Sequence, residues 1–187
     1  MNIILASNSP RRKELLKYIY PKFDIVPADI DETVPNGMAV TEYPQYIATQ
    51  KCKTVAKDYL SSVVIACDTT VIYNGSTILQ KPKDVAEATD TLTKLSGNVH
   101  QVTTGVCVYH NGTFTTFDET TKVKFNTLSN KQISEYVSTK EPFDKAGGYG
   151  IQGLGALLVE KIDGDYYNVV GLPISKLNRV LTELGLK

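Results

Sequence analysis

The chain has 187 residues, and its 20 Lys and Arg balance its 20 Asp and Glu, so the formal net charge is zero. A balanced charge argues against a broad surface for nucleic acid or an anionic membrane, and any anion must be bound by a local cluster. The length predicts one domain over residues 1–187 with a sizeable core. No apolar run approaches the length of a membrane span, and the first is too short for a signal peptide.

The cysteines are odd in number and lie far apart within apolar patterns, at Cys52, Cys67 and Cys107. They predict reduced core residues of a soluble cytoplasmic protein. With no C-x-x-C spacing and only two histidines, a zinc site is not expected. Any bound metal should therefore be held by oxygen ligands.

Residues 3–16, IILASNSPRRKELL, predict a short buried strand that turns into a basic helix. Ser9 has the position of an N-cap, with a proline at the first helical residue. Arg11 and Arg12 then place cations where the helix dipole favours anions by roughly 0.3 to 1 kcal/mol per charge. With the Ser7 hydroxyl and free backbone N–H groups, they predict a phosphate site. The alternative is a solvated basic turn.

A second strand is predicted over residues 23–26, and the acidic segment DIDET follows it at 29–33. Its closely spaced carboxylates, Glu32 among them, are candidate ligands of Mg²⁺ or Mn²⁺, which prefer carboxylate and water oxygens. A polar loop that caps the next element explains the same residues equally well.

Residues 42–60 predict a helix with one apolar stripe, and Lys51 falls inside the apolar arc instead of opposite it. A lysine at that position either extends along its stem to solvent or points its ammonium at a bound anion. The pattern alone leaves both possibilities open.

The apolar run VVIAC at 63–67 predicts a central strand, with Asp68 and Thr69 directly after its end. Ligand sites in α/β sheets tend to lie beyond strand carboxyl ends, so Asp68 is a candidate functional residue, with a turn-capping Asp as the alternative. A hairpin through Asn74-Gly75 returns the chain to Lys81, a candidate phosphate ligand or a surface lysine.

The next segments predict a scaffold: a helix at 84–96, strands at 99–109, 113–117 and 121–125, and a helix at 129–139. The glycine-rich stretch DKAGGYGIQGLG at 144–155 then contains a literal G-x-G-x-x-G. A dinucleotide site is not expected, because residues 156–162 predict a strand and not a helix. Gln152 remains a candidate for hydrogen bonds to a ligand edge, and a closing helix reaches residue 184.

Together these residues resemble the Maf family of nucleotide pyrophosphatases. The matching motifs span nearly the whole chain in family order: ILASNSPRRKELL, DET at 31–33, the Lys51 of QKCK, ACDTTV, LQKP, KAGGYGIQG and DGDYYNVVGLPI. The resemblance implies an α/β fold shared with inosine triphosphate pyrophosphatases, in which a long, mixed, twisted sheet flanked by helices forms two lobes around a central cleft.

The resemblance also implies hydrolysis of nucleoside triphosphates to the monophosphate and pyrophosphate with a divalent cation, and it suggests a homodimer. Asp68 matches the family's catalytic proton acceptor. The family's phosphate- and metal-site positions are matched by Ser7, Arg12, Glu32, Lys51 and Lys81. Chemically, Glu32 and Asp68 can hold a metal and water, while the cations, Arg11 included, can bind a triphosphate.

In the family, base preference is marked by three positions, which here are Arg11, Thr69 and Gln152. This combination resembles the dTTP/UTP branch, since the 7-methyl-GTP branch carries an aromatic residue, a glutamine and a glutamate. The Gln152 amide offers the donor and acceptor that a uracil or thymine edge requires. The competing hypothesis is a nucleotide-binding regulator of septum formation and cell division without significant turnover.

Overall fold

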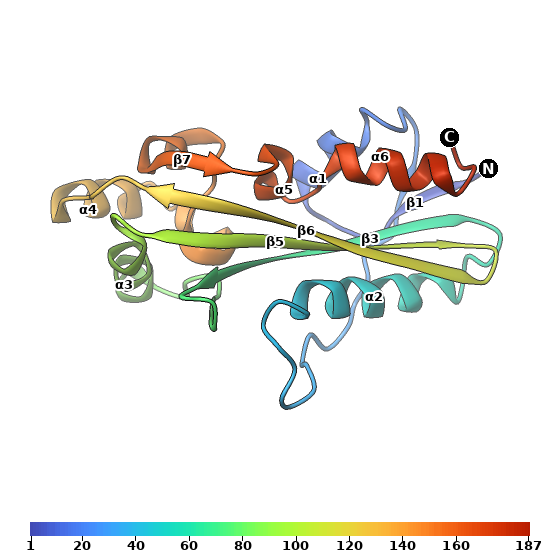
Figure 1. Cartoon of the computed structure of the whole chain (residues 1–187), viewed down its shortest axis with the longest axis horizontal. Coiled ribbons are helices and arrows are strands. Elements are labelled where there is room, and N and C mark those ends of the chain that lie inside the picture. Colours follow the sequence, from blue (N-terminus) through green and yellow to red (C-terminus); the bar gives the residue numbers. More distant parts are fainter.

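One mixed sheet of seven strands runs along the length of the molecule in this computed structural model, which describes residues 1–187 (Figure 1). The strand order is β2-β1-β3-β5-β6-β7, with β4 paired to β3; β1 is parallel to β2 and β3, and all other pairs are antiparallel. The strands are β1 (Ile3–Leu5), β2 (Asp24–Ile25), β3 (Val63–Tyr73), β4 (Thr77–Leu79), β5 (Val99–His110), β6 (Thr113–Phe125) and β7 (Val159–Asp163).

Helices pack against both faces of the sheet (Figure 1). The α-helices are α1 (Pro10–Leu16), α2 (Tyr43–Ala56), α3 (Val85–Leu95), α4 (Asn130–Ser138), α5 (Tyr166–Val170) and α6 (Ile174–Glu183). Three 3₁₀ turns follow α4, namely η1 (Glu141–Asp144), η2 (Ala146–Gly148) and η3 (Gly153–Leu158). None of the helices is both long and apolar enough to cross a bilayer.

The hydrophobic core divides into two lobes. In the first lobe, α1 and α6 pack on one face of the sheet and α2 packs on the other. In the second lobe, α3, α4 and the 3₁₀ segment pack together around Phe125. β3 and β5 supply buried side chains to both lobes. The first half of β6 packs against the first lobe, and its second half lies in the core of the second. Three continuous strands therefore join the lobes.

Local signals in the sequence predict several element ends correctly. The Ser9 side chain caps α1 by accepting from the backbone N–H of Arg12 at 3.5 Å. Ser129 and Gln132 form the predicted capping box of α4. Asn74 and the glycine after it both have positive φ, 51° and 70°, as a tight hairpin turn requires.

Strand lengths differ from the prediction at three places. β3 does not end at Cys67 but continues through Asp68 to Tyr73, because β-branched residues extend it and β5 pairs with it along this stretch. β6 is one strand instead of two, since β5 pairs with it over its whole length. Residues 153–158 form η3, so the last strand begins only at Val159. The prediction that Asp68 lies beyond a strand end is therefore wrong.

The extension of β3 creates a notch in the sheet. β1 pairs with β3 only as far as Ile65, and β4 begins to pair with it at Val71. Residues 66–70 of β3 consequently have β5 on one side and no strand on the other. Beside the notch, a Cβ on Gly105 would lie 2.2 Å from the backbone nitrogen of Gln45, so only glycine lets α2 approach the sheet this closely.

The core of the second lobe contains a buried histidine. His100 is 2% exposed, and its Nε2 lies 2.7 Å from the hydroxyl oxygen of Tyr149. Its ring meets those of Phe125 and Tyr149 edge to face, and its Nδ1 has no hydrogen-bond partner. Burial lowers the pKa of His100 to about 4, because the imidazolium would be charged inside an apolar core.

We expect the free energy of unfolding to fall by about 3 kcal/mol as the pH drops from about 6.5 to about 4 on account of His100. The folded-state pKa is depressed, so the unfolded chain takes up a proton in this range that the folded protein does not accept. Stability is thus present above the unfolded pKa and lost as the pH falls. Urea unfolding between pH 4 and 7 measures this loss.

His100→Gln should remove this part of the pH dependence, whereas His110→Gln, which removes the other histidine of the same strand, should keep it. Equal pH profiles for the parent and His100→Gln would contradict the assignment.

Candidate active site

A cleft of about 840 Å³ lies between the two lobes. Both lobes and the notch in β3 contribute side chains to its wall. Of the site residues predicted from sequence, the cleft wall contains Arg11, Arg12, Glu32, Lys51, Asp68, Thr69, Lys81 and Gln152. Ser7 does not line the cleft; it is buried below the wall.

The two residues at the centre of the notch point to opposite faces of the sheet. Asp68 follows the alternation of Val64 and Ala66, which pack in the core beneath α2. Thr69 has the opposite orientation and faces the α1 side, where it contacts Arg12. Because residues 66–70 have no strand on their outer side, both faces reach the same cleft.

On the α2 face, Lys51 lies between two carboxylates. Its Nζ is 2.8 Å from Oδ1 of Asp68 and 2.8 Å from Oε1 of Glu32. Burial alone would lower the pKa of Lys51, but the two carboxylates outweigh it and the pKa is raised, so the ammonium stays charged. Neither of the predicted alternatives, extension to solvent or a bound anion, describes Lys51 in this structure, since its partners are acidic side chains of the protein.

The same carboxylates are the donors available to a metal ion. No group of three or more His, Cys, Asp or Glu side chains forms a ready metal cage. Lys51 contacts Oδ1 of Asp68 and Oε1 of Glu32, and the second oxygen of each carboxylate accepts no hydrogen bond from the protein. Two carboxylates suit Mg²⁺ or Mn²⁺, which keep water and phosphate oxygens among their ligands. The donor set therefore fits such a cation.

On the α1 face, every nitrogen of the Arg12 guanidinium contacts an acceptor. Nε donates to the carbonyl of Gly171 at 2.9 Å, Nη1 donates to Oγ of Ser7 at 3.3 Å, and Nη2 donates to Oγ1 of Thr69 at 2.9 Å. All three acceptors are neutral, so the charge of Arg12 is not compensated by a carboxylate. Each terminal nitrogen keeps a second N–H that can bind a phosphate oxygen.

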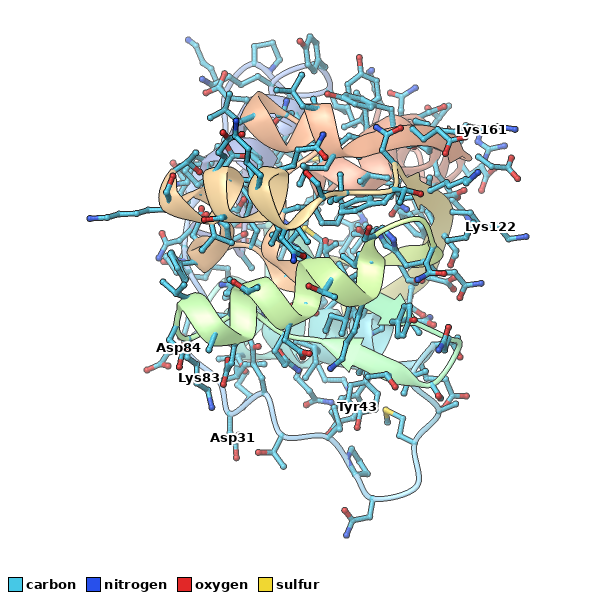
Figure 2. The ribbon with its side chains drawn as sticks, turned by 90° about the vertical axis from the view of Figure 1, so that its left-hand side faces the viewer. Asp31, Tyr43, Lys83, Asp84, Lys122 and Lys161 are labelled. Atoms are coloured by element: carbon cyan, nitrogen blue, oxygen red, sulfur yellow. The ribbon has the colours of Figure 1, made fainter.

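Further cations stand along the cleft wall. Arg11 Nη1 lies 3.7 Å from Oδ2 of Asp144, so this contact joins α1 of the first lobe to η1 of the second. Lys81 lines the cleft after β4, and Lys83, which sequence reasoning missed, lines it nearby. Figure 2 shows Lys83 beside the start of α3. The segment between β2 and α2, marked by Asp31, lies below this helix. The K-P-K spacing was the signal that could have identified Lys83.

The glycine-rich segment folds mainly against the protein itself. A Cβ on Gly155 would lie 2.1 Å from the carbonyl oxygen of Gly150, and one on Gly147 would lie 2.9 Å from the side chain of Val71. Gly147, Gly148 and Gly153 also have φ near +70°, which glycine adopts without strain. These contacts explain the glycines, and Gln152 is left exposed at the cleft wall.

Glu141, a residue that sequence reasoning did not identify, anchors this segment. Its Oε1 accepts from the Tyr136 hydroxyl at 3.0 Å and from the Gly155 N–H at 3.2 Å, and its Oε2 accepts from the Leu154 N–H at 3.2 Å. The backbone on the C-terminal side of Gln152 is therefore held by one half-buried carboxylate. Its partners in η3 lie 13 and 14 residues away, which no local motif reveals.

The family relationship follows from comparison of the whole chain with known proteins. A family model described as "Maf-like protein" matches residues 2–184. The chain belongs to this family. The Maf-like chain is 49% identical to a protein of Clostridium novyi named dTTP/UTP pyrophosphatase, covering 100% of this chain and 99% of that protein. It is also 49% identical to the Halalkalibacterium halodurans protein of the same name, with 98% and 96% covered.

Solved structures resemble the Maf-like chain in fold. A HAM1 protein from Coxiella burnetii superposes with a TM-score of 0.59 at 15% identity, covering 98% of this chain and 99% of that one. The Staphylococcus aureus Ham1 protein gives a TM-score of 0.52 at 19% identity over 68% and 73% of the two chains. At these identities the likeness concerns the fold alone, and the predicted mixed α/β fold is confirmed.

Glu141→Ala should loosen the segment after Gln152. Each lost hydrogen bond to a carboxylate is worth about 1.5 to 3 kcal/mol, so we expect the amide hydrogens of Leu154 and Gly155 to exchange at least about tenfold faster with solvent. Hydrogen-deuterium exchange followed by NMR measures this rate. Glu160→Ala, which removes an exposed ion pair with Lys124, is the control. Unchanged exchange at both amides would rule out the anchoring role.

Proposed function

We propose that this Maf-like protein is a nucleoside triphosphate pyrophosphatase that hydrolyses dTTP and UTP to the monophosphate and pyrophosphate. Relatives that carry the name dTTP/UTP pyrophosphatase share up to 49% of its residues over nearly their whole length. The observation that carries the proposal is the cleft itself, in which the Asp68-Lys51-Glu32 cluster and the Arg12 guanidinium lie on opposite faces of one strand.

The phosphate chain is bound by the cations of the cleft. Arg12 offers its remaining N–H groups in a rigid, planar fork that suits phosphate oxygens. Arg11, Lys51 and Lys81 add positive charge along the wall. These contacts strengthen as charge develops on the phosphate oxygens during attack at the α-phosphorus. Ser7 acts through Arg12 instead of binding phosphate directly, because its Oγ accepts a hydrogen bond from Nη1 of Arg12.

Asp68 and Glu32 would hold the divalent cation, Mg²⁺ or Mn²⁺. When bound, such a cation supplies charge neutralisation at the phosphates and a lower pKa for a coordinated water. The Asp68 carboxylate accepts the proton of the attacking water, while the Lys51 ammonium, kept charged by its raised pKa, remains beside both carboxylates or turns to a phosphate oxygen.

The nucleobase contacts Gln152. Its amide is exposed at the cleft wall and can both donate and accept hydrogen bonds, as the carbonyls and N3–H of uracil or thymine require. Arg11 and Thr69 complete the three positions that mark the dTTP/UTP branch. As part of the same proposal, the protein acts in the cytoplasm as a homodimer on small nucleotides and not on nucleic acid.

Asp68→Asn should lower kcat for dTTP and UTP by about 100-fold or more, because the amide cannot accept the proton of the attacking water. Pyrophosphate release from a panel of canonical and modified triphosphates, with Mg²⁺ and with Mn²⁺, measures this change. Asp118→Asn makes the same substitution on β6, outside the cleft, and serves as the matched control. No turnover of any triphosphate by the parent protein would overturn the proposal and favour a nucleotide-binding regulator.

Gln152→Glu should reduce activity on dTTP and UTP selectively, since a carboxylate cannot donate to a pyrimidine carbonyl. We expect a loss of about tenfold or more in kcat/KM for these two substrates relative to purine triphosphates. Gln80→Glu places the same charge elsewhere in the cleft and should weaken all triphosphates alike through repulsion. An unchanged substrate profile for Gln152→Glu would contradict the role of Gln152 in reading the base.

A further inference from the structure

A chain of hydrogen bonds leads from Arg12 into the interior of the protein. The Thr69 hydroxyl, which accepts from Nη2 of Arg12, lies 2.9 Å from Oγ1 of Thr104 on β5. The Thr104 hydroxyl in turn donates to the carbonyl of Asn168 on α5 at 3.1 Å. Thr104 is 0% exposed and does not line the cleft, so it contacts no ligand there.

The direction of each hydrogen bond in this chain follows from its ends. The carbonyl of Asn168 can only accept, so the single hydroxyl hydrogen of Thr104 is directed at it. In the contact between the two threonines, Thr69 must therefore be the donor. The Thr69 hydroxyl has no second hydrogen, and its oxygen faces Arg12 as an acceptor. While this chain is intact, Thr69 cannot donate a hydrogen bond to a nucleobase.

Both ends of this hydrogen-bond chain lie at α5 and at Gly171, the residue that caps its C-terminal end. Arg12 Nε donates to the carbonyl of Gly171, and the Gly171 N–H donates to the same Asn168 carbonyl that accepts from Thr104. The Asn168 side chain is fully buried and donates to the carbonyl of Val102 and to Oγ1 of Thr121. α5 is thus pinned to the sheet, and it holds the guanidinium from two directions.

We propose that Thr104 is a positioning residue for Arg12, acting through the hydroxyl of Thr69 to fix the orientation in which the guanidinium meets the phosphates. The inference rests on the proposed function for its effect on turnover, but not for its effect on Arg12 itself. In this role Thr69, one of the three residues that mark base preference, acts on the phosphate-binding Arg12.

The neighbouring residue Thr103 provides a matched control. Thr103 is 1% exposed and its hydroxyl lies 2.9 Å from that of Thr120, so it shares the burial and the threonine-threonine contact of Thr104. As the adjacent residue of β5, it faces the other side of the sheet. Replacing either threonine by valine deletes one buried hydroxyl, but only Thr104 is connected to Arg12.

The test compares Thr104→Val, Thr104→Ser and Thr103→Val. In Thr104→Val we expect KM for dTTP and UTP to rise and kcat to fall, because the Arg12 contacts strengthen as charge develops on the phosphate oxygens. The combined loss in kcat/KM should be about tenfold, the effect of one hydrogen bond. Thr104→Ser keeps the hydroxyl and should restore KM, while Thr103→Val should leave KM unchanged. Equal KM increases in the two valine variants, or no rescue by serine, would overturn the proposal.

A second readout does not depend on turnover. The NMR signal of the Arg12 Nε–H, assigned with Arg12→Lys, reports how firmly the guanidinium is held. We expect its exchange with solvent to quicken in Thr104→Val and to remain as in the parent in Thr103→Val. If the parent protein hydrolyses no triphosphate, the proposed function fails, and this signal still decides whether Thr104 positions Arg12. An unchanged signal in Thr104→Val would refute that role.

Discussion

The interrupted pairing of β3 is the constraint on which the site depends. A strand inside a sheet normally presents its two faces to separate layers, and a ligand reaches only one of them. Because β1 stops at Leu5 and β4 starts to pair only at Val71, residues 66–70 form an edge in the interior of the molecule. The alternation of side chains then delivers Asp68 to α2 and Thr69 to α1, while both remain in one cleft. Neither face could serve alone.

This arrangement separates the charges that the proposed chemistry needs. On the α2 face, Lys51 lies between Asp68 and Glu32, which leaves a net negative charge suited to a divalent cation. On the α1 face, Arg12 is held only by neutral acceptors and keeps its full positive charge for phosphate. Both groups are oriented by the protein before any ligand arrives, so little reorganisation is needed on binding.

The structural features that depend on short-range interactions were predicted correctly from the sequence. The cap at Ser9, the capping box of α4 and the hairpin turn at Asn74 depend on residues within a few positions of one another, and they form as expected. The extent of β3 was mispredicted, because a strand continues as long as a partner pairs with it, and β5 lies more than 25 residues further along the chain. Thr104 and Asn168 meet across 64 residues, and only the fold reveals that link. Lys51 was singled out by its place inside an apolar arc and Asp68 by its place directly after an apolar run, although their contact with each other was not foreseen.

The continuity of β3, β5 and β6 has a mechanical consequence. Enzymes that close around a ligand commonly bend at a loop between two rigid bodies. Here the lobes are joined by unbroken strands, which have no such loop at the level of the cleft. Any approach of the two lobes must increase the twist or curvature of the strands themselves. Closing of the cleft therefore stores elastic strain in the sheet. Relaxation of that strain favours reopening of the cleft and dissociation of the bound ligand.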